Sequence, residues 1–194
     1  MMKKALIGVL LLLATVGLCA QEKWSFSLLP GYQFSNGDSR AGFVGSLDGA
    51  YYFTDRVGLH FAYMYNEGKF RMNVPTAGNF DFKHDYSLVE VGPEFVGKAG
   101  QKGQIYGQIN AGYTFGSTSV TAYGMTVNNV MGNDWTFGLA FGYRYFFYTN
   151  VAFAVQGAYH HINGWSDSGW AGPYRFSFDG TNSWDARVGF HWKF

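Results

Sequence analysis

The sequence predicts an all-β fold, an eight-stranded antiparallel up-and-down β-barrel that spans a membrane, and three observations support this prediction. First, the segment Trp184–Phe194 alternates large aromatic residues with polar ones, which gives a strand one apolar and one polar face. Second, only 14% of the residues are charged and 20% are aromatic, against about 25% charged residues in soluble domains. Third, no run beyond the first 20 residues has the roughly 20 apolar residues of a membrane helix, so a closed barrel is the remaining way to span.

The first 20 residues have the pattern of a secretory signal peptide. A short basic segment, Met1–Lys4, precedes an apolar run, Ala5–Val16, and small residues follow. We therefore expect removal of residues 1–20 and a single barrel domain over residues 21–194. The alternative is a lipoprotein acylated at Cys19, but the bulky leucine before this cysteine argues against it. Loss of Cys19, the only cysteine, leaves no disulfide or thiolate chemistry.

Eight segments repeat the terminal alternation, and the first four are predicted at about 23–35, 41–54, 57–66 and 83–97. In each, one face is aromatic or aliphatic and the other carries mostly small or polar side chains. The apolar faces are Trp24, Phe26, Leu28, Tyr32 and Phe34; Phe43, Leu47, Tyr51 and Phe53; Val57, Leu59, Phe61, Tyr63 and Tyr65; and Val89, Val91 and Phe95.

The last four segments are predicted at about 104–115, 134–147, 151–161 and 184–194. Their apolar faces are Ile105, Ile109, Ala111, Tyr113 and Phe115; Trp135, Phe137, Leu139, Phe141, Tyr143 and Tyr145; Val151, Phe153, Val155 and Tyr159; and Trp184, Ala186, Val188, Phe190, Trp192 and Phe194. The alternation within 134–147 also predicts that Phe141 faces lipid and that Gly142 faces the interior, where we expect a serine to be tolerated.

The connections differ in length in the way an outer-membrane barrel requires. They are short around Asp55, Gly100 and Thr149, and longer after the third, fifth and seventh segments. Short periplasmic turns and longer extracellular loops predict an integral protein of the bacterial outer membrane. The long stretches 67–82 and 116–133 can extend as hairpins, and Tyr174–Phe178 is predicted to extend the last one above the membrane.

A soluble eight-stranded barrel of the lipocalin type is the alternative fold. It requires the opposite polarity, with the apolar face inward. So many aromatic side chains do not fit inside an eight-stranded barrel, whose interior is just wide enough for side chains to fill. The small and polar set fits there better.

The predicted interior face carries both signs of charge. Its ionisable residues are Asp48, His60, Glu90, Glu94, Arg144, Asp185, Arg187, His191 and Lys193. Charges buried in a narrow lumen must be paired, and Glu94 and Arg144 lie at similar heights near periplasmic turns. We therefore expect an internal network that plugs the lumen, with a narrow porin as the alternative.

No arrangement for catalysis or for a cofactor stands out. Glu90 and Glu94 are separated by roughly 13 Å along one strand, which exceeds the ~5–9.5 Å of glycosidase carboxylate pairs. His160, on the inner face, and its neighbour His161 face opposite sides, so they cannot share a metal. After signal removal twelve basic residues face thirteen acidic ones, which does not favour nucleic acid. We expect no enzyme activity, cofactor or metal.

Several of these residues carry a family resemblance. The segment GAYYFTDRVGLHFAYMY (Gly49–Tyr65), the eight-segment count and the terminal alternation resemble the OmpA/OmpX-like eight-stranded outer-membrane barrels. The resemblance covers essentially the whole mature chain. We expect a monomer surrounded by outer-membrane lipid and lipopolysaccharide. The resemblance also implies that the outer-membrane assembly machinery recognises the terminal pattern, which consists of Val188, Phe190, Trp192 and Phe194. OmpA itself adds a periplasmic peptidoglycan-binding domain, and that role is not carried over to this chain as an expectation.

Lipid A deacylases of the PagL type are also eight-stranded barrels, and they use a His-x-Ser-Asn segment. The corresponding residues here are His161-Ile162-Asn163-Gly164, in which asparagine stands where the family has its serine nucleophile. The resemblance therefore lacks the residue that would carry the reaction.

These observations predict a non-enzymatic scaffold that presents extracellular loops for surface interaction or adhesion. The last long loop carries the candidate binding residues Trp165, Trp170, Tyr174 and Arg175, which could stack on sugars or dock a cell-surface partner. The alternative is that they complete a hairpin and pack on the barrel rim.

Overall fold

The computed structural model describes residues 23–35, 42–74, 78–122, 125–127, 134–162, 167–171, 174–178 and 181–194. The strands are β1 (Trp24–Ser35), β2 (Gly42–Tyr52), β3 (Val57–Val74), β4 (Gly78–Lys98), β5 (Gly103–Ala122), β6 (Met125–Val127), β7 (Asp134–Tyr148), β8 (Val151–Ile162), β9 (Asp167–Ala171), β10 (Tyr174–Phe178) and β11 (Thr181–Lys193). No helix in these ranges is long and apolar enough to cross a membrane.

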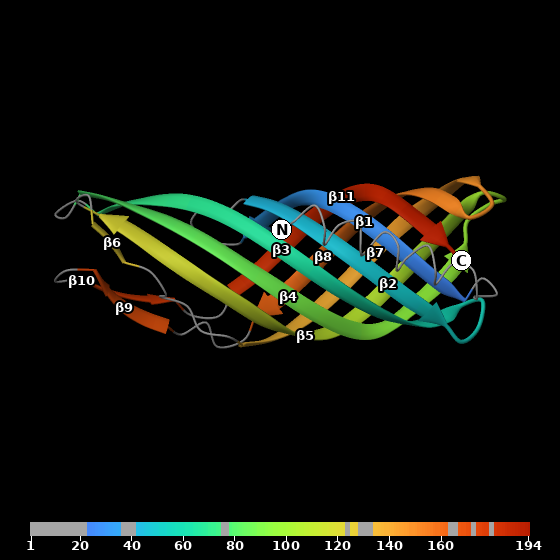
Figure 1. The fold of residues 1–194 in the computed structure, drawn as a ribbon, viewed down its shortest axis with the longest axis horizontal. Coiled ribbons are helices and arrows are strands. Elements are labelled where there is room, and N and C mark those ends of the chain that lie inside the picture. Colours follow the sequence, from blue (N-terminus) through green and yellow to red (C-terminus); the bar gives the residue numbers. More distant parts are fainter. Residues whose placement is uncertain are drawn as a thin grey trace, which may run out of the picture.

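Eight of these strands close into an antiparallel up-and-down barrel, as predicted. The strands are paired in the order β4-β3-β2-β1-β11-β8-β7-β5, and pairing of β4 with β5 closes the ring. Figure 1 shows the strands tilted steeply against the long axis, as closure of a barrel requires. The strand β6 pairs only with β5, and β9 and β10 form a separate two-stranded sheet.

The barrel has its apolar side chains outside and its polar side chains inside. Leu28, Phe61, Val91 and Leu139 are about half exposed, and Phe141 is 71% exposed. Every second residue between such positions is buried or nearly so, as in β7 and β8. This polarity is opposite to that of a soluble barrel and is stable only in lipid.

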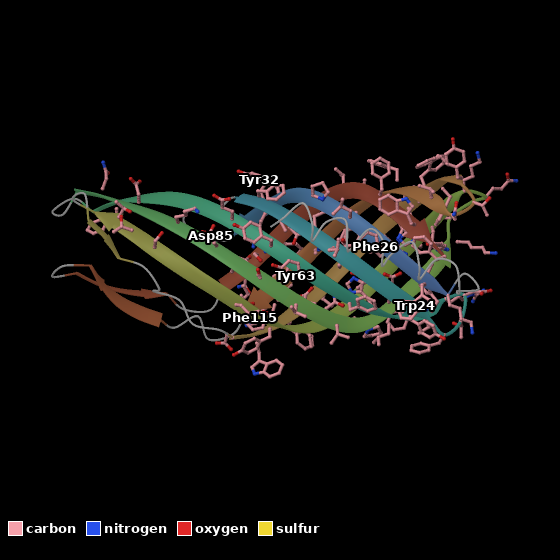
Figure 2. All side chains as sticks on the ribbon, viewed as in Figure 1. Trp24, Phe26, Tyr32, Tyr63, Asp85 and Phe115 are labelled. Atoms are coloured by element: carbon pink, nitrogen blue, oxygen red, sulfur yellow. The ribbon has the colours of Figure 1, made fainter. Side chains whose placement is uncertain are left out.

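Two aromatic girdles mark the membrane-spanning part of the barrel. Trp24 lies near the end with the short turns, and Tyr32, Tyr63 and Phe115 lie about midway along the molecule, while Asp85 lies farther from that end (Figure 2). The rings pack in neighbouring pairs, for example Trp24 with Tyr51 at 4.9 Å, Tyr159 with Trp184 at 4.8 Å and Tyr113 with Trp135 at 5.4 Å between centroids. Aromatic belts of this kind lie at the two membrane–water interfaces. Because the turns of outer-membrane barrels are short on the periplasmic side, the end with the short turns is the periplasmic one.

Beyond the outer girdle, β3, β4 and β5 continue as an extracellular sheet (Figure 1). The strands continue past the segment ends near residues 66, 83 and 115 into the stretches for which hairpin extensions were predicted, because pairing runs on to Val74↔Gly78 in β3–β4 and to Asp81↔Thr121 in β4–β5. The hairpin then turns back through Ala122↔Met125. Outside the membrane neither face has to meet lipid, so the alternation that locates the strands fades while backbone pairing continues.

The segment Tyr174–Phe178 does not extend the last barrel hairpin, which corrects the sequence prediction. It pairs as β10 with β9, from Tyr174↔Ala171 to Phe178↔Asp167. Pairing of β8 with β11 begins at Ile162↔Thr181. The short β9–β10 hairpin thus lies in the loop between two barrel strands.

Candidate functional site

The lumen holds almost all of the ionisable residues that alternation places on the inner face. Asp48, His60, Glu90, Glu94, Arg144, Asp185, Arg187 and His191 are each at most 5% exposed. Lys193 differs, because it lies half-buried at the periplasmic mouth. Glycine, alanine and serine at neighbouring inward positions leave room for these long side chains.

The first cluster is built around the ion pair of Glu94 and Arg144. Arg144 donates from Nη1 to Glu94 Oε1 at 2.8 Å and from Nη2 to Oε2 at 3.0 Å. Tyr52 donates to Glu94 from the far side, and Gln108 Nε2 donates to Oε2 at 2.7 Å. The Arg144 guanidinium carbon lies 3.8 Å from the centre of the Tyr106 ring. The residues come from β2, β4, β5 and β7, so the cluster bridges the bore.

A second cluster lies around His160, an inward-facing residue that is not among the ionisable lumen residues predicted from the sequence. Its Nδ1 lies 3.0 Å from Glu90 Oε1, and its Nε2 lies 2.9 Å from Asp185 Oδ2. Arg187 donates to the other Asp185 oxygen at 2.7 Å. A carboxylate oxygen only accepts hydrogen bonds, so each of these two ring nitrogens must carry a hydrogen to donate. A neutral imidazole has a hydrogen on only one of its two nitrogens. The signal that could have found His160 is the excess of inward carboxylates over inward arginines.

The remaining two lumen histidines make weaker or single contacts. His60 Nδ1 lies 3.3 Å from Asn110 Oδ1, and its Nε2 lies 3.9 Å from Asp48 Oδ2. His191 Nδ1 lies 2.9 Å from Ser27 Oγ, close to the periplasmic mouth. Polar groups therefore line the bore from its centre to its inner end.

Apolar side chains fill the lumen nearer the extracellular end. Val44, Met64 and Leu88 form one buried cluster, and Tyr86 packs with Ile162 in another. Their position above the charged clusters follows from the strands, because each of these residues lies nearer the outer end of its strand than the ionisable lumen residue on the same strand. The charged network thus lies beneath an apolar layer.

The extracellular sheet carries its own charges. Lys83 Nζ lies 3.0 Å from Asp85 Oδ2 and 3.7 Å from Glu67 Oε1, with all three side chains partly exposed. The hydrogen bond to Asp85 raises the pKa of the Lys83 ammonium. This cluster is exposed and screened by solvent, so it shapes the surface charge more than the stability.

The predicted loop-binding residues lie partly within the described structure. Trp165 lies outside the described residues. Trp170 is on β9, and Tyr174 and Arg175 are on β10, where Trp170 and Arg175 are register partners. The hairpin therefore brings an indole-bearing and a guanidinium-bearing residue to adjacent backbone positions.

The terminal strand contributes both to the lipid face and to closure. Val188 and Phe190 are about half exposed. The ring of Trp192 lies 6.0 Å from that of Phe190. The backbone of Phe194 exchanges hydrogen bonds with Trp24, at 2.8 and 3.3 Å. The residues expected to form an assembly signal thus continue the apolar stripe to the seam between β11 and β1.

Three further features bear on enzyme chemistry. His161 is exposed, its Nδ1 lies 2.7 Å from Asn182 Oδ1, and Asn163 lies outside the described residues. Among the described residues, no group of three or more His, Cys, Asp or Glu side chains is placed to hold a metal ion. A recess of about 460 Å³ beside Phe141, at Gly107 and Gly157, faces lipid and is lined by mainly apolar residues.

Comparison with known proteins bears on the fold. No protein-family model matches the sequence, and no curated protein matches it either. Among solved structures, Neisserial surface protein A is 16% identical with a TM-score of 0.60, covering 89% of this chain and 97% of that one. A major outer membrane protein from Thermus thermophilus is 12% identical with a TM-score of 0.56, covering 88% and 99%. OprG from Pseudomonas aeruginosa is 15% identical with a TM-score of 0.54, covering 89% and 97%.

These likenesses extend over nearly the whole length of both chains in each comparison. They agree with the closed ring of eight strands and with its apolar exterior. The chain therefore has the fold of the eight-stranded outer-membrane β-barrels and is an integral protein of the outer membrane.

Proposed function

We propose that this protein is a non-enzymatic scaffold that holds an extracellular β-sheet at the cell surface for interaction or adhesion. The observation that carries the proposal is the continuation of β3, β4 and β5 far beyond the outer girdle. The β3–β4 pairing is unbroken from Val57↔Phe95 to Val74↔Gly78, and the β4–β5 pairing reaches Asp81↔Thr121. Because the sheet is a direct continuation of barrel strands, the closed barrel fixes its position, and its surface is presented in one orientation.

The filled lumen supports the scaffold over the narrow porin. Glu94 and Arg144 are joined across the bore, and Tyr52 reaches the same site from β2. Moving an ion through this level would require separating a buried, doubly hydrogen-bonded pair, which is costly in a low dielectric. The apolar layer of Val44, Met64 and Leu88 adds a second obstacle.

The surface chemistry of the outer end supports a polar or sugar-bearing partner on another cell. The sheet carries both signs of charge at Lys83, Asp85 and Glu67, and the β9–β10 hairpin pairs Trp170 with Arg175. Aromatic and guanidinium groups together suit stacking on sugars. The barrel itself contacts outer-membrane lipid and lipopolysaccharide, and nothing in its closed ring requires a second copy.

The test shortens the outer hairpins without disturbing the barrel. Phe70 and Phe82 are register partners, so residues 71–81 can be replaced by Asn-Gly, which favours a two-residue hairpin turn. A second variant combines Trp170→Ala with Arg175→Ala, and Asp55→Asn in a periplasmic turn serves as the control. Cells displaying each variant are assayed for attachment to glycan arrays and cultured cells.

We expect the two outer variants to reduce attachment while Asp55→Asn leaves it unchanged. Attachment that persists after both outer changes would contradict the adhesion proposal. A change in lipid A mass that depends on the protein would indicate a lipid-modifying enzyme instead.

A further inference from the structure

The periplasmic rim contains a hollow of about 780 Å³ that the scaffold proposal does not use. Its wall comes from the turn between β4 and β5, from the end of β7 and from the end of β11. Figure 2 shows several nitrogen-tipped side chains projecting at this end of the barrel. The hollow is open to solvent and lies at the mouth of the lumen.

The charge of this hollow is positive. Lys98, Lys102 and Lys193 line it, and the residues that the structure describes around it include no Asp or Glu. The Lys193 ammonium lies 4.8 Å from the centre of the Phe146 ring, which orients it over an aromatic face. Three like charges around one hollow raise the local potential, so an anion that enters it is attracted by all three.

The rest of the wall combines neutral hydrogen-bonding groups with aromatic rings. Gln101 and Thr149 can donate to an anionic oxygen, and Gln104 accepts a hydrogen bond from Arg144 at 3.4 Å. Phe147 and Tyr148 are 41% and 69% exposed. These two rings continue the inner aromatic girdle, so a ligand in the hollow also meets the membrane boundary.

We propose that this hollow binds the phosphate group of an anionic phospholipid from the periplasmic leaflet, such as phosphatidylglycerol. The lysines contact the phosphate oxygens as point charges. The acyl chains continue along the exposed strip of Ile105, Tyr145 and Phe147, which are each about half exposed. A soluble phosphate could meet the lysines but would leave this apolar strip unused, which favours the lipid as occupant.

The test measures lipid binding by native mass spectrometry of the full-length mature protein in a neutral detergent. Phosphatidylglycerol and phosphatidylcholine with the same acyl chains are titrated separately, and sn-glycerol 3-phosphate is titrated as the soluble phosphate. Three lysines near an anionic lipid should give a preference of roughly 100-fold for phosphatidylglycerol over phosphatidylcholine.

The variant Lys98→Gln/Lys102→Gln/Lys193→Gln should bring the two lipids to within about twofold of each other, and Lys102→Gln alone should lower the preference about fivefold. Arg56→Gln is the matched control, because Arg56 lies in the neighbouring periplasmic turn and does not line the hollow. Far-UV circular dichroism shows whether each variant keeps its barrel.

Three results would overturn the proposal. Equal binding of the two lipids by the wild type would remove the anion preference. A loss from Arg56→Gln as large as that from Lys102→Gln would assign the preference to the overall charge of the rim. Binding of sn-glycerol 3-phosphate as tight as that of phosphatidylglycerol would assign the site to a soluble anion.

Discussion

Arg144 illustrates how single residues make a charged lumen tolerable. It is 3% exposed, yet both terminal nitrogens bond Glu94, one of them also bonds Tyr52, and its face lies on Tyr106. The pair is stable because nearly every polar atom around the carboxylate has a partner. Removal of one member leaves the other charged and buried, which costs more than the pair itself contributes.

Arg144→Ala should therefore lower the free energy of unfolding by about 3–5 kcal/mol. The double change Arg144→Ala/Glu94→Gln should recover part of the loss, because it removes the uncompensated carboxylate. Urea titration in lipid vesicles measures both, and a double-mutant cycle isolates the coupling. Strictly additive effects would mean that the two residues do not stabilise each other.

At the scale of one element, β7 shows how differently the two faces of a strand respond to substitution. The expectation that Gly142 tolerates serine is wrong. A Cβ there would lie 2.4 Å from the Val155 carbonyl oxygen and 2.5 Å from the Tyr106 ring. Tyr106 supports Arg144, so a side chain at this position would disturb the ion pair as well. Gly107, on the lipid face of the adjacent β5, is open, with its nearest contact at 3.8 Å.

We predict that Phe141→Arg destabilises the barrel by about 2–4 kcal/mol, the cost of a basic residue at the bilayer midplane. Gly142→Ser should cost about 1–3 kcal/mol through overpacking. Gly107→Ala should be near neutral. Urea titration in lipid vesicles measures the free energy of unfolding of the three variants. If Phe141→Arg left it unchanged while Gly107→Ala lowered it, the assignment of these two residues to the lipid face would be wrong.

At the scale of the whole molecule, the strands form a closed ring and the side chains inside it block the lumen. Pairing of β4 with β5 and of β1 with β11 leaves no open seam in the ring. Inside, the clusters around Glu94 and His160 lie below the apolar cluster around Met64. Planar bilayers containing the pure protein should therefore show no steady conductance, whereas bilayers with an open porin as the control should conduct. Ohmic single-channel steps from this protein would favour its function as a narrow porin.

Assembly of the whole barrel gives a separate prediction for Phe194. Phe194→Ala keeps the two backbone hydrogen bonds to Trp24, and the lost ring burial is worth at most roughly 1.5–3 kcal/mol. We expect refolding into detergent to stay nearly intact while the amount assembled in cells falls. Equal losses in refolding and in cellular assembly would mean that the Phe194 ring acts only by packing. Normal assembly of Phe194→Ala in cells would contradict recognition of this residue by the assembly machinery.

Alternation predicted which residues face the bore, but it could not predict which of them meet. Glu94 and Arg144 were paired from their similar heights near the periplasmic turns. His160 was placed on the inner face without a role, because its partners Glu90 and Asp185 lie 70 and 25 residues away in sequence. Alternation predicted the inward side of Lys193 but not its grouping with Lys98 and Lys102, since the three lysines come from two separate strand ends and a turn.

The sequence by itself determined the barrel, the strand number within the membrane and the face of each strand. Lipid on one side and a narrow polar bore on the other impose a two-residue period that survives in every spanning segment. The tertiary structure alone decided how far β3, β4 and β5 continue outside, that β9 and β10 pair with each other, and which lumen charges form clusters. These features depend on strand register and on contacts across the bore, and no local period in the sequence encodes either of them.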